Sequence, residues 1–412
     1  MREEVCSVKE ITEGVRAVIN SRQEQLTDAE VLSLIEDYVL RDQRTESYSF
    51  RKKGEVITGI FNATRKDLDL LQPYADDKEV SEIMVNGIDS IFIERKGKIE
   101  KLNIRFESVE DLEEIIRRIA AKVHREINEL NPIVDARLED GSRVNAVYKN
   151  VALNGPILTI RRFPESRIMM EDLLESGTIT PEASEFLKTL VRAGYNIFIS
   201  GGTSSGKTTF LNVLSEFIPK DERVIVIEDS AELQISGIEN IVRLECKNAN
   251  VQGKGEISIR QLIKASLRMR PNRIIVGEVR GAEVLDMIQA MNTGHDGSLS
   301  TGHGNSPEGM LSRIEAMFLQ AADFPIDAIR SQIAEAIDII VHLGRLPDKS
   351  RKVLEISEIE SYREGRIFMN PLFQYKADTQ AHHSGASPKG QLIPTGHQLK
   401  NTLKLERNGI YI

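Results

Sequence analysis

The chain has 412 residues, enough for two or three domains, and its hydrophobic share of 40% and charged share of 28% are typical of a globular protein. A formal net charge of −9 argues against a nucleic-acid partner, because neutralising phosphates requires a basic face. The two cysteines supply neither a disulfide framework nor a metal cluster. The N-terminus is not typical of a signal peptide and no apolar run has membrane-spanning length, so we expect a cytoplasmic protein.

Residues 1–65 are predicted to form a helical N-terminal extension. Thr27-Asp28-Ala29-Glu30 matches a capping box, and Val31, Ile35 and Val39 follow it at helical spacing. Three interpretations of this region stay open: a small helical module, an arm that docks on a partner, and a solvated helical appendage.

Residues 66–165 are predicted to form a separate α+β domain, followed by a linker over 166–179. The expected elements in chain order are a strand ending in a hairpin signal (82–87), a second strand (90–94), a helix capped by Ser108, and two further strands (143–147 and 157–160).

Residues 180–375 alternate between strand and helix patterns, which predicts a mostly parallel sheet covered on both faces. The candidate strands are 196–200, 223–228, 241–246, 273–277, 298–302 and 337–343. A C-terminal tail over 376–412 begins with a loop rich in Gly, Ser, His and Pro and ends with a polar helix over about 398–407, and we assign the tail no role.

The most informative segment follows the first of these strands. Residues 201–209 contain Gly-x-x-x-x-Gly-Lys-Thr, the phosphate-binding P-loop, with a strand before it and a helix after it. Glycines let backbone N–H groups curl around an anion, and the helix N-terminus adds positive charge. Lys207 is expected to reach the β- and γ-phosphates of ATP, and the Thr208 hydroxyl to bind Mg²⁺. The predicted nucleotide-binding residues are Gly201, Gly202, Thr203, Ser204, Ser205, Gly206, Lys207, Thr208 and Thr209.

Hydrolysis also needs a carboxylate that orients water, and two apolar strands end in acidic residues. Glu228 and Asp229 follow one strand, and Glu278 follows the other. Because the carboxyl ends of parallel strands line the ligand crevice, these groups are expected beside the P-loop. We expect Glu278 to orient the water, with Glu228 and Asp229 supporting Mg²⁺ and its waters.

Two histidines, His295 and His303, flank one short strand among several glycines. A metal pair would lack an evident third ligand, and a lone histidine often only completes hydrogen bonds in a core. The glycines indicate close approach to a ligand or a neighbouring subunit, where histidine can donate to phosphate oxygens.

Arginines from the α+β domain are the remaining candidates. Arg137, Arg143, Arg161 and Arg162 lie in its last strands. Each is either a surface charge or a group that closes on the γ-phosphate when the protein binds nucleotide.

Taken together and in this order, these motifs resemble the ATPase superfamily of type II and type IV secretion systems, over about residues 66–375. The signature segments are the P-loop, an aspartate box (228–233), an atypical Walker B motif (277–281) and a histidine box (293–305). The segments 82–87, 190–194, 268–271 and 290–298 look most like the tight-adherence (Tad, Flp-type) pilus assembly branch.

The resemblance implies a RecA-like catalytic domain after the α+β domain. It also implies a homohexamer at the cytoplasmic face of the inner membrane, where ATP hydrolysis pushes on a polytopic inner-membrane platform protein. Within that resemblance, Arg143 and Arg161 best match the arginines that reach the γ-phosphate, while Arg137 and Arg162 match less well. A ring-type nucleic-acid translocase and a non-hydrolysing nucleotide-dependent scaffold are the alternatives.

The chain departs from the family pattern in its histidine box. Gly302 and Gly304 stand where the Tad branch usually has Leu and Ala. Because glycine removes packing and adds backbone freedom, we expect this segment to be looser than in relatives.

Overall fold

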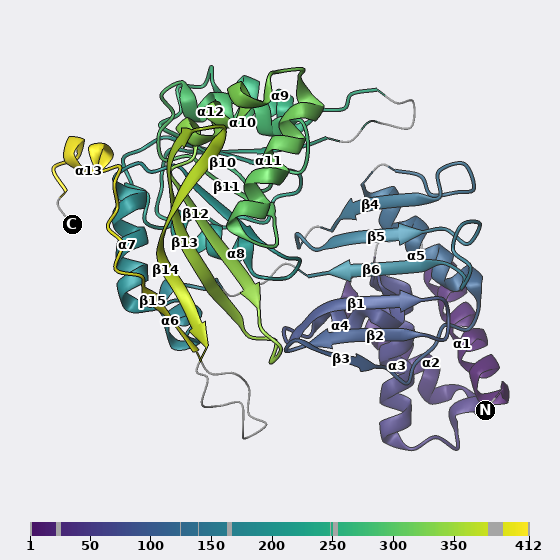
Figure 1. Ribbon diagram of the computed structural model, residues 1–412. Helices are drawn as coiled ribbons and strands as arrows, with labels where there is room; N and C mark the ends of the chain where they lie inside the picture. The colour runs from purple at the N-terminus through teal and green to yellow at the C-terminus, as the bar shows by residue number, and fades with distance from the viewer. Residues whose placement is uncertain are drawn as a thin grey trace. The chain divides into compact units, whose positions relative to one another are not determined.

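A computed structural model describes residues 2–21, 26–123, 125–138, 140–162, 167–247, 249, 254–377 and 390–410 (Figure 1). The chain divides into two compact units, Met1–Ser166 and Arg167–Ile412. Among the described residues, no helix is both long enough and apolar enough to cross a membrane.

The first unit begins with three helices, α1 (Arg2–Ser21), α2 (Asp28–Arg41) and α3 (Phe50–Arg65). The capping box at the start of α2 is confirmed, because the Thr27 backbone N–H donates to Glu30 Oε2 at 2.7 Å. The helices share a core of their own, made of Ile11, Val15, Val31, Ile35, Val39, Val56 and Ile60. This core makes the segment a packed helical module and corrects the interpretation as a solvated appendage.

The rest of the first unit is a six-stranded antiparallel sheet in the order β3-β2-β1-β6-β5-β4. Its strands are β1 (Val80–Asn86), β2 (Ile91–Arg95), β3 (Lys98–Lys101), β4 (Ile133–Arg137), β5 (Arg143–Val147) and β6 (Ile157–Arg161). Helix α5 (Val109–Lys122) is capped by Ser108 and contributes Leu112, Ile115, Ile116 and Ile119 to the sheet's core. The short helix α4 (Gln72–Asp76) precedes β1.

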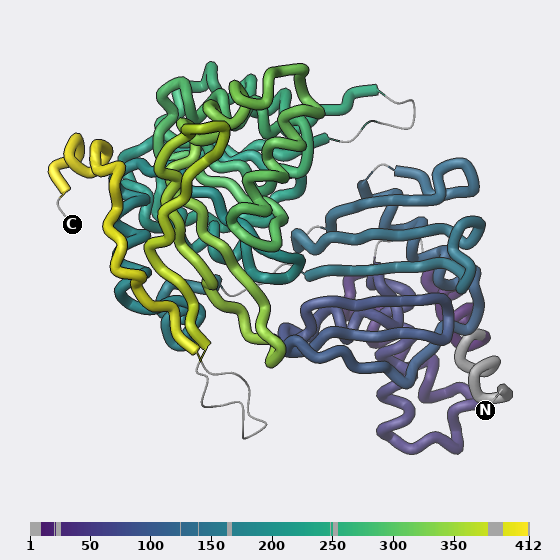
Figure 2. The backbone as a smooth tube through the Cα atoms, viewed as in Figure 1, coloured from purple at the N-terminus to yellow at the C-terminus, as the bar shows by residue number. Residues whose placement is uncertain are grey.

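The second unit is built on a nine-stranded sheet in the order β15-β14-β13-β12-β7-β11-β10-β8-β9. The strands from β12 to β9 are parallel, and all six had been predicted from their apolar runs. These are β7 (Ile197–Gly201), β8 (Val224–Glu228), β9 (Ile241–Glu245), β10 (Arg273–Val276), β11 (Leu299–His303) and β12 (Ile339–Arg345). The antiparallel strands β13 (Arg351–Arg363), β14 (Arg366–Ala377) and β15 (Gly390–Pro394) extend the sheet (Figure 2).

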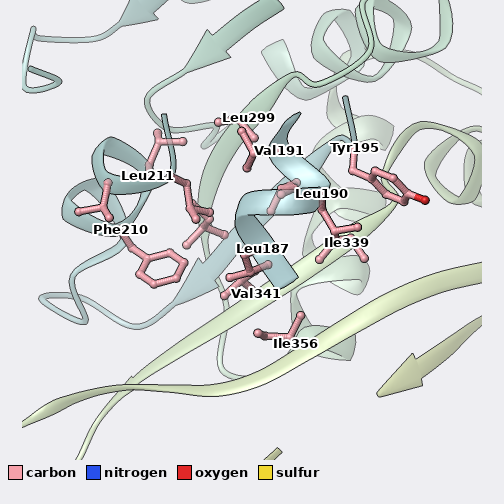
Figure 3. Close-up of a cluster of buried hydrophobic side chains, with 14 of the residues drawn as sticks. Leu187, Leu190, Val191, Tyr195, Phe210, Leu211, Leu299, Ile339, Val341 and Ile356 are labelled. Atoms are coloured by element: carbon pink, nitrogen blue, oxygen red, sulfur yellow. The ribbon is translucent and has the colours of Figure 1, made fainter. Parts of the chain in front are cut away.

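Helices cover both faces of the parallel part of the sheet. Alternate residues of the central strand β7 point to opposite faces, and both sets are apolar, so each face is buried beneath helices. Ile197 and Ile199 of β7 pack into one core with Leu187, Leu190, Phe210 and Leu211, several of which Figure 3 shows. Phe198 lies in the second core with Met310. The helices are α7 (Pro181–Arg192), α8 (Lys207–Ser215), α9 (Ile259–Ser266), α10 (Glu283–Asn292), α11 (Pro307–Ala321) and α12 (Ile326–Ala336). The result is the expected α/β, RecA-like fold.

Two boundary predictions need correction. The range 166–179, predicted as a linker, contains helix α6 (Met170–Glu175), and Met170, Leu173 and Ile179 are buried in the core of the second unit. The predicted tail contains β15, which pairs with β14, in part of the range expected to be a surface loop. Helix α13 (Leu403–Arg407) lies within the expected polar helix, but its Leu405 is buried. In both segments, a few apolar residues among many charged ones are enough for docking onto an existing core.

Candidate nucleotide-binding and catalytic site

The predicted P-loop connects the carboxyl end of β7 to the first turn of α8. A side chain at Gly201 would place its Cβ 2.5 Å from both the Leu343 carbonyl oxygen and Ser205 Oγ, so only glycine fits there. Ser204 and Gly206 have left-handed backbone conformations, with φ of +59° and +94°. These turns bend the chain back on itself before the helix, and they produce the cradle that the sequence indicated.

The loop presents polar groups suited to a phosphate. Ser205 Oγ is buried and has no hydrogen-bond partner among the described residues. A buried hydroxyl without a partner is energetically costly, and a phosphate oxygen would satisfy it. Thr208, the expected Mg²⁺ ligand, is half-buried at the second position of α8.

Lys207 begins α8 and is buried beneath the loop. Its Nζ donates to the Gly202 carbonyl oxygen at 2.9 Å and lies 3.3 Å from Nδ1 of His303. Burial lowers the pKa of Lys207, while the nearby carboxylate of Glu278 acts in the opposite direction. The ammonium group is therefore held in place by the loop and by the end of β11.

His303 connects the P-loop lysine to Glu278. Its Nε2 lies 3.0 Å from Glu278 Oε1. Because the ammonium of Lys207 can only donate, Nδ1 must accept and the ring proton sits on Nε2. This N–H is not aligned with Glu278 Oε1, which is buried and has no hydrogen-bond partner among the described residues. Burial and the charge of Lys207 lower the pKa of His303, which favours this neutral ring. Lys207, His303 and Glu278 therefore form one polar cluster in which one carboxylate oxygen is left unbonded.

Arg280 completes the acidic side of the site. Its Nη2 donates to Glu278 Oε2 at 2.9 Å, and its Nη1 lies 3.7 Å from Asp229 Oδ2. The hydrogen bond to Glu278 is the main reason why the pKa of Arg280 is raised. Sequence reasoning gave Arg280 no separate role, although its place two residues after Glu278 was a usable signal.

Glu228, the other predicted carboxylate, is used differently. It is 4% exposed, and its Oε1 accepts the backbone N–H groups of Glu232 and Leu233 at 2.8 and 2.9 Å. Burial raises its pKa, and the two N–H donors partly oppose this. Glu228 therefore stabilises the turn after β8, while the neighbouring Asp229 is exposed beside Arg280.

No group of three or more His, Cys, Asp or Glu side chains in the described part of the chain is arranged to hold a metal ion. Mg²⁺ in nucleotide sites is held largely by substrate phosphates, waters and one or two protein oxygens, so the hydroxyl of Thr208 and the carboxylate of Asp229 fit that pattern.

The structure separates His295 from this site, contrary to our expectation of a shared role with His303. β11 runs parallel to β7 in a register that pairs Leu299 with Ile197 and His303 with Gly201. His303 is therefore at the P-loop end, and His295 lies before the opposite end, where its Nδ1 is 3.2 Å from the Ala290 carbonyl oxygen. Because the two histidines flank this strand, its length keeps them apart, which excludes a metal pair within one chain.

The expectation of a loose histidine box is wrong as well. A Cβ on Gly302 would lie 2.9 Å from Met310 Cε and 3.0 Å from Phe198 Cε1, and one on Gly304 would lie 3.0 Å from Met310 Cβ. Met310 and Phe198 thus fill the space that larger residues would need. The strand remains packed because the side chain that fills the gap comes from α11.

A pocket of about 330 Å³ opens beside the P-loop, entirely within the second unit. Ser205, Gly206 and Thr209 contribute one wall, and Leu173 and Phe210 contribute apolar surface. The remaining lining residues are Ile168, Asp172, Ser176, Thr178, Leu343, Lys349, Ser350 and Arg351. The sequence did not predict this pocket, because its lining comes from the supposed linker and from the β12–β13 hairpin.

In the first unit, the two best arginine candidates are cross-strand neighbours. Arg143 of β5 is the register partner of both Arg161 of β6 and Arg137 of β4. Like charges directly opposite each other are destabilising in a sheet, but Arg161 also has a carboxylate as a neighbour, because Glu82 of β1 is its register partner on the other side. Arg162 instead donates to the backbone carbonyls of Asp77 and Val80, which makes it a structural residue.

A RecA-like sheet that carries a P-loop, with a carboxylate at the end of a neighbouring strand, defines the class of P-loop nucleotidases. Residues 64–395 match the family described as type II/IV secretion system protein, and the chain belongs to that family.

Individual relatives agree with this assignment. The chain is 32% identical over 308 residues to the conjugal transfer protein TrbB of Rhizobium radiobacter, covering 74% of this chain and 91% of the relative. It is 31% identical over 326 residues to the type IV secretion system protein PtlH of Bordetella pertussis, covering 72% and 94%. Among solved structures, the pilus retraction motor PilT with bound ADP is similar in fold, with a TM-score of 0.52 at 19% identity, over 82% of this chain and 86% of that one.

Proposed function

We propose that the protein is a Mg²⁺-dependent ATP hydrolase that drives a secretion or pilus system. The observation that carries this proposal is the polar cluster of Lys207, His303 and Glu278. Lys207 is suited to bind phosphate, and Glu278 is suited to orient the attacking water, because Arg280 binds its Oε2 while its Oε1 has no hydrogen-bond partner among the described residues. A scaffold that only binds nucleotide would not need a carboxylate held in this way.

The two cross-strand arginines supply the second half of the proposal. Arg143 and Arg161 together are suited to neutralise the γ-phosphate of bound ATP. After hydrolysis the phosphate leaves, and most of the negative charge that the two arginines neutralise leaves with it.

The proposed assembly, membrane partner and branch of the family rest on the sequence motifs. We propose a homohexamer at the cytoplasmic face of the inner membrane, acting on a polytopic inner-membrane platform protein in a tight-adherence type of pilus assembly. The family membership supports a secretion motor in general, and the segments 82–87 and 290–298 are the support for this branch. The net charge of −9 disfavours the alternative of a nucleic-acid translocase.

The test is the ATPase activity of the purified protein with and without Mg²⁺, in the wild type and in Lys207→Ala. We expect slow Mg²⁺-dependent turnover that rises when rings assemble, and no turnover in Lys207→Ala with an unchanged melting temperature. Lys220→Ala, an exposed lysine of the same unit, is the matched control and should behave like the wild type. Nucleotide binding without turnover in the wild type would favour the scaffold, and salt-dependent DNA binding would favour the translocase.

A further inference from the structure

The β12–β13 hairpin lies against the P-loop. Its turn is closed by the Leu346 N–H, which donates to the Ser350 carbonyl oxygen at 2.8 Å, and β13 begins at Arg351. The Arg351 carbonyl oxygen accepts the Thr178 hydroxyl at 3.0 Å, and Lys352 Nζ donates to the carbonyls of Ser176 and Gly177 at 2.8 and 2.7 Å. The backbone of Arg351 is therefore fixed to the segment after α6.

The side chain of Arg351 extends over the P-loop. Its Nε donates to the Ser204 carbonyl oxygen at 3.1 Å, and its Cδ lies 3.2 Å from the position that a Cβ would occupy on Gly206. Ser204 is the non-glycine residue of the loop with a left-handed φ of +59°, a conformation that costs energy for an L-residue. A charged donor on its carbonyl helps to hold that turn.

The same side chain lines the 330 Å³ pocket beside the loop. Ile168, Leu173 and Phe210 contribute apolar surface to the same pocket. A guanidinium and apolar side chains around one pocket suit a planar aromatic ring, because arginine stacks on aromatic faces.

We propose that Arg351 is a nucleotide-binding residue that links the two halves of the ligand: it holds the Ser204 turn of the P-loop and stacks on the base of the nucleoside triphosphate. This inference rests on the proposed ATPase function. It assigns recognition of the base to the β12–β13 hairpin. This hairpin is separate from the P-loop, the acidic strand ends and the histidine box.

The experiment compares a ligand that has a base with one that lacks it. The full-length protein is titrated calorimetrically, in the presence of Mg²⁺, with the ATP analogue AMP-PNP and with inorganic tripolyphosphate. We expect Arg351→Ala to weaken AMP-PNP binding about tenfold, the size of a lost stacking and charge contact. Tripolyphosphate binding should weaken at most about threefold, through the Ser204 turn alone. Arg351→Lys keeps a donor but not the flat guanidinium, so it should restore tripolyphosphate binding more than AMP-PNP binding.

Arg345→Ala is the matched control. Arg345 is the register partner of Arg351 on β12 and is an exposed arginine outside the pocket lining. Equal losses for both ligands in Arg351→Ala, or AMP-PNP binding no weaker than in Arg345→Ala, would overturn the inference while leaving the ATPase proposal standing. If the wild-type protein binds neither ligand, the proposed ATPase function itself is wrong. Melting temperatures of the variants establish that each is folded.

Discussion

The Nε2 atom of His303 lies 3.0 Å from the Oε1 atom of Glu278, although 25 positions of sequence numbering separate the two residues. They meet because β10 and β11 are parallel neighbours in the sheet, and Glu278 follows β10 while His303 ends β11. The other ring nitrogen of His303 faces Lys207. One imidazole thus joins the phosphate-binding lysine to the carboxylate proposed to orient water.

Glu278→Gln is expected to bind ATP normally but to hydrolyse it at least about 10²-fold more slowly, because the amide cannot take a proton from the attacking water. Single-turnover kinetics with pre-bound ATP measure the chemical step separately from binding. Glu228→Gln is the control, since its side chain stabilises the turn at Glu232 and Leu233 and should keep most of the activity. A chemical defect in Glu228→Gln but not in Glu278→Gln would mean that the two roles are reversed.

Arg143→Ala and Arg161→Ala are each expected to lose most hydrolysis, on the order of 10³ in rate, while ADP affinity stays within a few-fold of the wild type. Because the two residues are cross-strand partners, the double variant should lose less than the product of the single losses. Steady-state turnover and ADP titration measure the two quantities. Lys98→Ala, an exposed residue on the far edge strand of the same sheet, is the control. If ADP binding falls as much as hydrolysis, the arginines do not act on the γ-phosphate.

The pH dependence of stability should carry a contribution from His342. Burial lowers the pKa of this residue, and the nearby Glu308 and the Asn305 carbonyl oppose the effect only partly. The folded state therefore binds a proton on His342 more weakly than the unfolded chain does. The resulting loss of folding stability is absent well above the ordinary imidazole pKa of about 6.5. The loss grows as the pH falls through that value, and it stops growing once the pH is below the pKa of His342 in the folded state.

The measurement is urea unfolding at pH 8 and pH 5 in the wild type and in His342→Gln. Glutamine can still bond to Ser200 Oγ, which lies 2.7 Å from His342 Nδ1, but it does not titrate. We expect the variant to lose less free energy of unfolding between the two pH values than the wild type does. The carboxylates are common to both proteins, so an identical loss would show that His342 contributes nothing to the acid sensitivity.

Gly302→Ala is expected to destabilise the protein by about 1–3 kcal/mol, because the new Cβ would be driven into Met310 and Phe198. Met310→Ala should destabilise the wild type by creating a cavity, but the cost should be smaller in the Gly302→Ala background, since the clash disappears. Chemical denaturation of the four proteins gives the coupling energy. Gly54→Ala is the control: it lies inside α3 with open space around it and should stabilise slightly. Additive effects at 302 and 310 would contradict the packing described for the histidine box.

The sequence alone determined the P-loop, the parallel strands and the acidic residues at their ends. These features are local: an apolar run of five or six residues specifies a buried strand, and the glycines and lysine at fixed spacing specify the loop that follows it. The capping box at Thr27 and the helix after Ser108 were readable for the same reason, since each depends on residues three or four positions apart.

Only the tertiary structure decided which of these groups meet. The parallel register of β7 and β11 placed His303 beside Lys207, and no spacing in sequence encodes that register. Arg351 reaches Ser204 across 147 positions, and α6 docks on a core to which it contributes only a few apolar side chains. Met310 fills the space above Gly302 from another helix. Such contacts depend on how elements distant in sequence pack together. Local sequence patterns therefore predicted the motifs, but they could not predict which of their side chains meet in the site.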